Sequence, residues 1–409
     1  MMQPDKTDAM APWLSVIGIG EDGFDGLSSA ARILVSQAKL IVGGPRHLAL
    51  IGEVNAQKLV WPSPLTNALT TLLAHRGEPT VVLASGDPFY FGVGELLSRH
   101  VPKREILSLP TPSAFTLAAS RLKWSQQDCA CLSLHGRAFE RIIPHLQPRA
   151  RIIALSWDET TPARLAAHLT ANRMGDSLIH VLEHMGGSDE KIRLTRARDF
   201  ELTDISALNT IAIEIVTDAQ SKVISLAPGL PDDWFENDGQ LTKREIRAIT
   251  LSTLGPRRGE ILWDIGAGAG SIAIEWMLTD PSNRAIAIER HPDRAARIAR
   301  NALTLGTPDL DIVTDEAPKC LERLEQPDAI FIGGGANSNM LAAAWEALPI
   351  NGRLVINAVT LETQALLTQQ FAQKGGDLIE INIARARSVG RYHGLDPAMA
   401  VLQWRGNKS

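Results

Sequence analysis

The residues with the clearest chemical potential are the glycines of the segment Ile261 to Gly270, which reads ILWDIGAGAG. A short apolar run contains Asp264 near its end, and Gly266, Gly268 and Gly270 follow at alternate positions. Because glycine has no Cβ, such a turn can bend tightly and let the backbone come close to a ligand. The apolar stretch SIAIEWML comes next and favours a helix. A strand, a glycine turn and a helix in this order predict the first unit of a nucleotide-binding α/β domain.

Acidic residues recur after the next two predicted strands. RAIAIER ends beside Glu289, which lies about 20 residues beyond the glycines, where a carboxylate reaches ribose hydroxyls. Asp315, Glu316 and Ala317 follow a third strand, at the place where an adenine ring would lie. Ligands of open parallel sheets bind at the carboxyl ends of the strands. The pattern therefore predicts one ligand site, and the alternative is that Asp264, Glu289 and Asp315 are solvated loop acids.

The spacing of the glycines bears on which ligand is bound. A dinucleotide fingerprint places its third glycine one residue later, where this chain has Ser271. An acid followed by alternating glycines is instead typical of Rossmann-like methyltransferases that use S-adenosylmethionine (SAM). An NAD-dependent oxidoreductase is the alternative among enzymes. An RNA-binding protein with a methyltransferase domain is the alternative from another class.

Length and composition narrow these alternatives. A chain of 409 residues is long enough for two or three domains. A net charge of −5 argues against nucleic-acid binding, since such domains are usually strongly basic. The sequence has neither a signal-peptide pattern nor an apolar run of about 18 residues, so we expect no membrane association. Its 3 cysteines are too few for a disulfide framework and favour a cytoplasmic location.

A stretch rich in proline, glycine and acidic residues divides the chain. It predicts a first domain over residues 12–226, a linker over 227–240 and a second domain over 241–405. After the linker, a helix is expected to begin at Thr242, with Glu245 completing a capping box.

The first half also alternates strands and helices. Its strongest strand begins at Thr80 and runs into Gly86-Asp87-Pro88, which alone would be read as an ordinary turn. His180 and His184 have helical metal-site spacing, but IHVLEHM reads better as a strand. Cys129 and Cys131 are expected to be buried thiols of another strand. We therefore predict no metal site.

Several motifs of the first half together resemble the tetrapyrrole methylase family. They are Gly18-Ile19-Gly20, GGPRHL, SGDPFYFG, SAFTLAASRL, SLHGR and LEHMGGSDEKI. The second half, with GQLTKREIRA, the glycine motif, TDEAPKCL, FIGGG and IARARSVG, resembles the methyltransferases that methylate and decarboxylate a precorrin. This resemblance covers residues 12–405. It implies an α/β protein in which a two-lobed tetrapyrrole methylase fold precedes a Rossmann-like SAM methyltransferase domain.

The resemblance implies a function in cobalamin biosynthesis. The expected reaction is SAM-dependent methylation of a precorrin at C-5 and C-15, with decarboxylation of the C-12 acetate. No nucleophilic side chain is needed, because the electron-rich ring carbon attacks the methyl group, and we assign no catalytic residue. The resemblance also implies a homo-oligomer built through the second domain.

Candidate site residues follow from the motifs and from this resemblance. The cofactor-binding candidates are Gly86, Asp87, Pro88 and Ser113 in the first domain, and Thr242, Gly266, Ala267, Gly268, Ala269, Gly270, Glu289, Glu316 and Ala317 in the second. Guanidinium groups bind carboxylates in a bidentate manner, and the precorrin substrate carries many carboxylates. The substrate-binding candidates are His135, Arg137, Arg385, Arg387 and Arg391.

Overall fold

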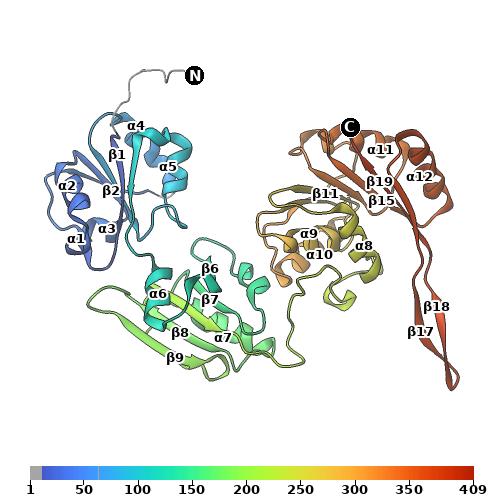
Figure 1. Ribbon diagram of the computed structural model, residues 1–409, viewed down its shortest axis with the longest axis horizontal. Helices are drawn as coiled ribbons and strands as arrows, with labels where there is room; N and C mark the ends of the chain where they lie inside the picture. Colours follow the sequence, from blue (N-terminus) through green and yellow to red (C-terminus); the bar gives the residue numbers. More distant parts are fainter. Residues whose placement is uncertain (1–11, 63) are drawn as a thin grey trace, which may run out of the picture. The chain divides into compact units, whose positions relative to one another are not determined.

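The computed structural model describes residues 12–62 and 64–409, and the chain divides into two compact units (Figure 1). The first unit is the chain up to Arg137 together with Gln147–Lys222. The second unit is Val223–Ser409 together with the short segment Ala138–Leu146. That segment belongs to the second unit although the chain returns to the first unit after it, which the sequence pattern did not predict.

The first unit begins with a five-stranded sheet in the order β3-β2-β4-β1-β5, in which every pairing is parallel. All six residues of the interior strand β1 are buried, as expected for a parallel strand covered on both faces. The elements are β1 (Leu14–Ile19), α1 (Gly23–Gly26), α2 (Ser29–Gln37), β2 (Leu40–Gly43), α3 (Pro45–Leu50), β3 (Gln57–Val60), η1 (Leu65–Ala68), α4 (Leu69–Ala74), β4 (Thr80–Ser85), α5 (Gly94–His100), η2 (Lys103–Glu105) and β5 (Ile106–Leu109).

A second five-stranded sheet completes this unit, in the order β6-β7-β10-β8-β9, and only β6 and β7 among these neighbours run parallel. Helix α6 (Ala114–Leu122) buries Phe115, Ala118 and Ala119 with side chains of β7, β8 and β10. The other elements are η3 (Gln126–Asp128), β6 (Cys129–Ser133), β7 (Arg151–Leu155), α7 (Thr161–Ala171), β8 (Leu178–Glu183), β9 (Lys191–Arg196), η5 (Ala197–Asp199) and β10 (Asn209–Glu214). The predicted strand at His180 is confirmed as β8, and His184 follows its last residue.

The second unit is built on a seven-stranded sheet in the order β13-β12-β11-β14-β15-β19-β16. The first five strands are parallel and β19 is antiparallel to both of its neighbours. The elements are η4 (Phe139–His145), η6 (Asp232–Trp234), α8 (Arg244–Leu254), β11 (Ile261–Ile265), α9 (Ser271–Thr279), β12 (Arg284–Ile288), α10 (Pro292–Thr304), β13 (Asp311–Val313), η7 (Leu321–Arg323), β14 (Ala329–Ile332), α11 (Ser338–Ala347), β15 (Arg353–Ala358), α12 (Leu361–Lys374), β16 (Asp377–Ile381) and β19 (Val401–Asn407). The predicted α/β fold with a Rossmann-like second domain is confirmed.

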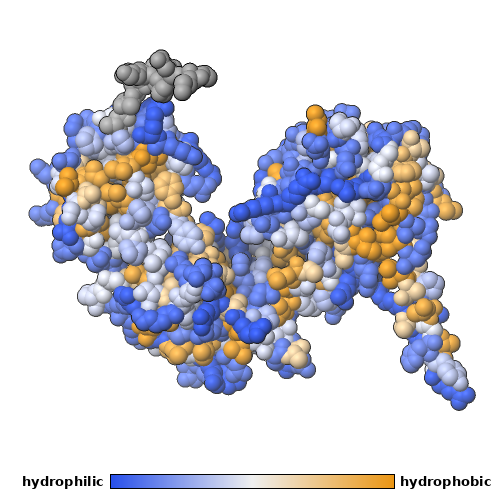
Figure 2. Space-filling model, in the orientation of Figure 1, coloured by the Kyte–Doolittle hydropathy of each residue, from blue (hydrophilic) through white to orange (hydrophobic). Residues whose placement is uncertain are grey.

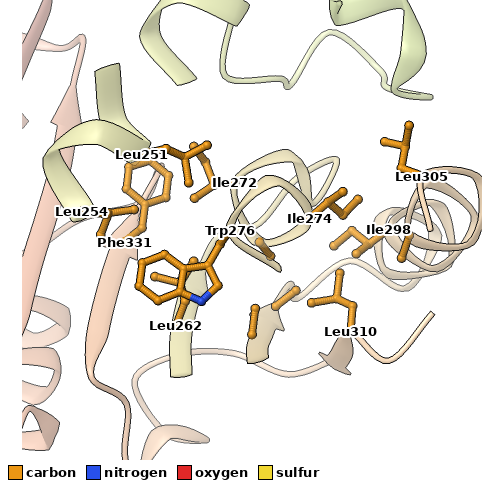
Figure 3. Packing of buried hydrophobic residues seen from close by; sticks show 14 of the residues in the cluster. Leu251, Leu254, Leu262, Ile272, Ile274, Trp276, Ile298, Leu305, Leu310 and Phe331 are labelled. Carbon is orange, nitrogen blue, oxygen red and sulfur yellow. The ribbon is translucent and has the colours of Figure 1, made fainter. Parts of the chain in front are cut away.

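Helix α9 lies in the centre of one core layer of this unit (Figure 3). Its residues Ser271 to Trp276 are all buried, which is the pattern of a helix covered on every side. Figure 3 shows Ile272, Ile274 and Trp276 of α9 among side chains from α8, α10 and the sheet. Each large side chain buried here contributes roughly 1.5–3 kcal/mol. This packing fixes the helix that follows the glycine turn.

The segment expected to be a linker, 227–240, packs onto the second unit instead. Leu230 and Phe235 are buried in the core of that unit. The Glu275 carboxylate, on α9, accepts hydrogen bonds from the backbone N–H of Gly229 at 2.6 Å and of Leu230 at 2.9 Å. Turn-forming residues indicated a loop correctly, but composition does not reveal that a loop is held by a buried carboxylate.

Arg247 of α8 completes this buried attachment. Its side chain is fully buried, donates to Glu275 Oε1 at 2.6 Å and to Asp232 Oδ1 at 3.1 Å, and stacks on Phe235. The predicted capping box at Thr242 is wrong. Helix α8 begins at Arg244 with Lys243 as its N-cap and no side-chain cap. The Thr242 carbonyl instead accepts a hydrogen bond from Arg247 at 2.5 Å.

Strands β17 (Ala384–Val389) and β18 (Tyr392–Pro397) form a separate two-stranded antiparallel arm. Figure 1 shows this arm extending from the seven-stranded sheet of the second unit. All six residues of β17 are exposed. The arm starts on the side of the sheet where the parallel strands have their carboxyl ends. The last residue of β15, Ala358, pairs there with Leu402, near the start of β19.

Candidate cofactor and substrate sites

The predicted glycine turn joins β11 to α9. At all three glycine positions the backbone conformation or the neighbouring atoms require a residue without a side chain. Gly266, Gly268 and Gly270 have φ angles of +73°, +60° and +75°, in the left-handed region that favours glycine. A Cβ on Gly268 would lie 3.1 Å from the Gln240 carbonyl oxygen, and one on Gly270 would lie 2.7 Å from Ile298. Ala267 and Ala269 lie between them, and Ala269 is buried.

Glu289 lies directly after β12 and contacts this turn. Its Oε2 accepts a hydrogen bond from the Gly268 N–H at 3.0 Å, and its Oε1 accepts one from the His291 N–H at 3.0 Å. The residue is buried, with 4% of its surface exposed, so it is not a solvated loop acid. Each carboxylate oxygen retains acceptor capacity beyond these bonds. The structure therefore brings the glycine turn and the predicted ribose-binding acid together.

Asp264 is likewise buried, with 1% of its surface exposed, inside strand β11. Its Oδ2 accepts a hydrogen bond from the Ala273 N–H of α9 at 3.1 Å. Burial, with a smaller contribution from the nearby Glu289 carboxylate, raises the pKa of Asp264 to about 7, although the hydrogen bond from the Ala273 N–H acts in the opposite direction. The solvated-loop alternative is therefore wrong for Asp264 as well, whereas Asp315 is 40% exposed and pairs with Arg323.

The raised pKa of Asp264 gives a testable pH dependence. Between about pH 4 and the folded-state pKa of about 7, the unfolded chain releases this proton while the folded chain keeps it. Stability should therefore fall as the pH rises through this interval. We expect Asp264→Asn to remove that component, so the stability of the variant relative to wild type should increase from acid to neutral pH. Urea unfolding at several pH values checks this, and parallel curves would contradict it.

The remaining cofactor candidates of this unit lie around the same edge. Strand β13 ends beside Glu289, because the Glu289 N–H donates to the Val313 carbonyl at 3.1 Å. Beyond β13, Glu316 is exposed and lies 3.8 Å from Lys319, and Ala317 packs against a second core cluster. Thr242 lies two residues after Gln240, and the Gln240 carbonyl oxygen lies close to Gly268 of the turn. Within residues 12–62 and 64–409 the Thr242 hydroxyl makes no hydrogen bond, so its predicted role in cofactor binding stays a prediction.

The three arginines predicted to bind substrate are distributed along the arm. Arg385, near its base, forms an ion pair with Glu245 of α8. Arg387 lies 3.6 Å from Asp396 on the paired strand. Arg391 lies at the connection between the strands and stacks on Tyr392. Arg385 is therefore held by the helix that precedes β11 and the glycine turn. Arg387 and Arg391 lie farther along the arm from this helix.

In the first unit, the candidates Gly86 and Ser113 lie against each other. Gly86 has a φ of +58°, and a Cβ there would lie 2.7 Å from the Ser113 Cα. The Ser113 hydroxyl caps α6 by accepting a hydrogen bond from the Thr116 N–H at 3.2 Å. The Asp87 carboxylate accepts one from the Phe89 N–H at 2.9 Å, and Pro88 is buried. These side chains shape the loop.

Arg137 meets the same loop from the second sheet. Its guanidinium lies 5.4 Å from the ring centre of Phe91, which in turn packs on Tyr90 and Phe115. His135 is exposed in the turn that precedes Arg137. The structure thus brings Arg137 to the Gly86–Gly92 loop. It leaves an exposed aromatic surface, since Phe89, Tyr90 and Phe91 are all at least 40% exposed.

A chain of polar contacts in the first unit was not predicted. It joins Ser85, the last residue of β4, to His47 and Arg46 after β2, to Glu21 after β1 and to His184 after β8. GGPRHL had been noted only as a family motif. The position of Arg46 and His47 at the start of the helix that follows a buried strand was the one signal that could have marked them.

The described part of the chain lacks two features, a cluster of metal-binding side chains and a membrane-spanning helix. Within residues 12–62 and 64–409, no group of three His, Cys, Asp or Glu side chains could hold a metal ion. Among the helices of those residues, none is long and apolar enough to cross a membrane.

Comparison with known proteins matches both halves of the chain to families. Residues 14–201 match the family described as tetrapyrrole (corrin/porphyrin) methylases, and residues 233–408 match the precorrin methyltransferase domain. A solved structure of the C-terminal domain of a Rhodobacter capsulatus precorrin-6Y C5,15-methyltransferase is 46% identical. It covers 45% of this chain and 100% of that chain, with a TM-score of 0.44.

Two curated relatives are also similar. A protein from Saccharolobus solfataricus, named a probable cobalt-precorrin-6B C(15)-methyltransferase (decarboxylating), is 39% identical over 143 residues, which is 33% of this chain and 72% of that protein. A Sinorhizobium protein named precorrin-6Y C(5,15)-methyltransferase (decarboxylating) is 49% identical over 401 residues, which is 98% of this chain and 97% of that protein. With both domains present and a relative matched over nearly its whole length, the chain belongs to the family of precorrin-6Y C(5,15)-methyltransferases (decarboxylating).

Proposed function

We propose that this enzyme methylates a precorrin macrocycle at C-5 and C-15 and decarboxylates its C-12 acetate, converting precorrin-6B to precorrin-8X in cobalamin biosynthesis. SAM is the proposed methyl donor for both additions. The observation that carries the proposal is the glycine turn of the second unit. A glycine-rich backbone and the buried carboxylate of Glu289 meet there, at the carboxyl ends of the parallel strands.

The residues of the second unit fit SAM. The left-handed φ angles of the alternating glycines let the backbone turn tightly at the carboxyl ends of the parallel strands, and Glu289 offers acceptors for ribose hydroxyls. Bound SAM supplies an electrophilic methyl group on a sulfonium. The protein positions the reacting carbon in line with that methyl group, and such positioning is worth roughly 7–11 kcal/mol. Glu316 and Ala317, after β13, are the proposed neighbours of the adenine ring.

We assign C-15 methylation and decarboxylation to the second unit and C-5 methylation to the first. The Saccharolobus relative carries C-15 methylation and decarboxylation together in its name, and 143 residues make up 72% of it, so it has the size of one domain. This supports placing both steps in one unit. The second half of this chain matches the precorrin methyltransferase domain.

For the substrate, we propose that arginines bind the peripheral carboxylates. Arg137 lies beside an exposed aromatic surface, which suits a flat conjugated ring with anionic side chains. In the second unit Arg385, Arg387 and Arg391 are the proposed partners. His135 is placed with Arg137 because both belong to the turn after β6.

The first-unit cofactor loop gives a prediction that separates charge from shape. The Asp87 carboxylate holds a turn by accepting from the Phe89 N–H. An asparagine carbonyl can make the same bond, whereas alanine cannot. We therefore expect Asp87→Asn to keep C-5 methylation within about threefold, while Asp87→Ala loses roughly tenfold or more, equivalent to one hydrogen bond.

The masses of the products report the number of methyl groups added by each variant. If Asp87→Asn is as defective as Asp87→Ala, the negative charge rather than the turn is what the site requires.

The overall proposal is tested by incubating the purified full chain with SAM and precorrin-6B. Mass spectrometry should show two added methyl groups and one lost carbon dioxide. A product with no added methyl group would overturn the proposed function. A shift in melting temperature with NAD but not with SAM would favour an oxidoreductase.

We also propose that the protein is a homo-oligomer assembled through the second unit. The arm carries exposed apolar side chains, with Val389, Tyr392 and Leu395 at 55%, 67% and 74% exposure. Figure 2 shows hydrophobic and hydrophilic residues mixed along this arm. Light scattering of the full chain and of a variant lacking 385–396 measures the assembly.

The free thiols of Cys129, Cys131 and Cys320 support a cytoplasmic location.

A further inference from the structure

The chain of polar contacts in the first unit is centred on Ser85, an exposed residue at the last position of β4. Its hydroxyl lies 2.8 Å from the His47 Nε2 and accepts a hydrogen bond from Arg46 Nη2 at 2.9 Å. Ser85 directly precedes Gly86 and Asp87 of the proposed cofactor loop. An accessible hydroxyl is therefore held between a cation and an imidazole at the ligand edge of the sheet.

The neighbours of His47 determine which way the proton of the Ser85 hydroxyl points. Arg46 has only donors, and its Nη2 lies 3.2 Å from the His47 Nε2 as well. With Arg46 donating to the serine oxygen, the serine O–H is free to donate to the His47 Nε2. Burial and the Arg46 charge lower the pKa of His47 to about 4, so the imidazole is neutral and able to accept.

The Glu21 carboxylate balances the charge of the Arg46 guanidinium and also contacts His184. Glu21 forms an ion pair with Arg46 and accepts from His184 Nδ1 at 3.3 Å if that nitrogen is protonated. The His47 Nδ1 is buried and has no hydrogen-bond partner among the described residues. His47 can therefore exchange a proton through Nε2, toward Ser85, and not through its other nitrogen.

Methylation of a ring CH position requires that one proton leave. The ring carbon gains the methyl group as the S–CH₃ bond of the donor breaks, which leaves that carbon with four single bonds and a positive ring. The C–H bond then breaks and its electrons restore the conjugation. In the second unit the departing carbon dioxide leaves an electron pair behind. The first unit has no such source and needs a proton acceptor.

We propose that Ser85 is the catalytic residue that accepts this proton in the first unit, with His47 as the positioning residue that takes the serine proton at Nε2. The Ser85 oxygen receives the ring proton as its own proton moves to His47, so the number of protons is conserved. A weak base suffices, because a proton on the carbon of a cationic ring is strongly acidic. This inference rests on the proposed function of the first unit.

The experiment compares Ser85→Ala, His47→Ala and the control His75→Ala in the full chain with SAM and precorrin-6B. His75 is a half-buried histidine of the same unit whose ring Nδ1 contacts the Thr71 carbonyl and lies outside this chain of contacts. Product masses report each methyl group, and calorimetry reports SAM binding. We expect C-5 methylation to fall roughly 10²- to 10³-fold in the first two variants, with C-15 methylation and SAM affinity unchanged. Added imidazole should restore His47→Ala but not Ser85→Ala.

The outcomes separate the two proposals. A wild-type chain that adds no methyl group overturns the proposed function and this inference with it. A wild-type chain that adds both methyl groups, with Ser85→Ala at full rate, overturns the inference alone. Loss of SAM binding in Ser85→Ala, or absence of imidazole rescue in a His47→Ala variant that still binds SAM, would show a structural role and also overturn it.

Discussion

Gly268→Val is expected to abolish SAM binding in the second unit while leaving the first unit intact. Gly268 has a φ of +60°, which a β-branched residue rarely adopts, and its Cβ would lie 3.1 Å from the Gln240 carbonyl. The change would also displace the Gly268 N–H from Glu289, to which it donates. Strain, collision and a lost hydrogen bond act at the same place, so affinity should fall by more than about 100-fold.

Gly259→Val is the matched control for this change. Gly259 also has a left-handed φ, +81°, but it precedes the opposite end of β11 and a Cβ there would meet nothing within 4 Å. It should lose stability through the same backbone strain and still bind SAM at both sites. Calorimetry should count one class of site in Gly268→Val and two in Gly259→Val. Two classes of site in both variants would show that the turn is not the cofactor site.

Glu275→Ala is expected to destabilise the second unit by about 3–5 kcal/mol, the usual cost of leaving a buried charge without its partner. Arg247 is fully buried and loses its 2.6 Å bond to Glu275, and the N–H groups of Gly229 and Leu230 lose their acceptor. The segment 229–242 should then detach, because these bonds hold it to α8 and α9. Since Gln240 lies over Gly268, SAM affinity should fall as well.

Glu325→Ala provides the comparison for this prediction. Glu325 also pairs with an arginine of the second unit, Arg284 at 2.8 Å, but both side chains are about half exposed. Exposed pairs contribute roughly 0–1 kcal/mol, so this variant should unfold near the wild-type urea concentration. Hydrogen exchange in α8 and α9 locates the loss to the second unit. Equal stability of the two variants would mean that the buried network contributes little.

Local patterns predicted much of the second unit. The run ILWDI, the alternating glycines and the helix after them follow rules that act over a few residues, and the structure has β11, the turn and α9 in these places. Glu289 was predicted to reach the same site from the end of β12, and it contacts the Gly268 N–H. Neighbouring parallel strands bring their ends together, so order along the chain was sufficient.

The two α/β halves, the glycine turn and the acid that meets it could be predicted from the residues alone, because each follows from periodicity, backbone freedom or strand order. The burial of Arg247 against the expected linker, and the place of Ser85 between Arg46 and His47, depend on how the strands and helices assemble. These contacts join residues far apart in sequence, so no local pattern encodes them. Arginine and serine are mostly exposed in proteins and histidine is intermediate, and which of them becomes buried or paired is fixed when the strands assemble.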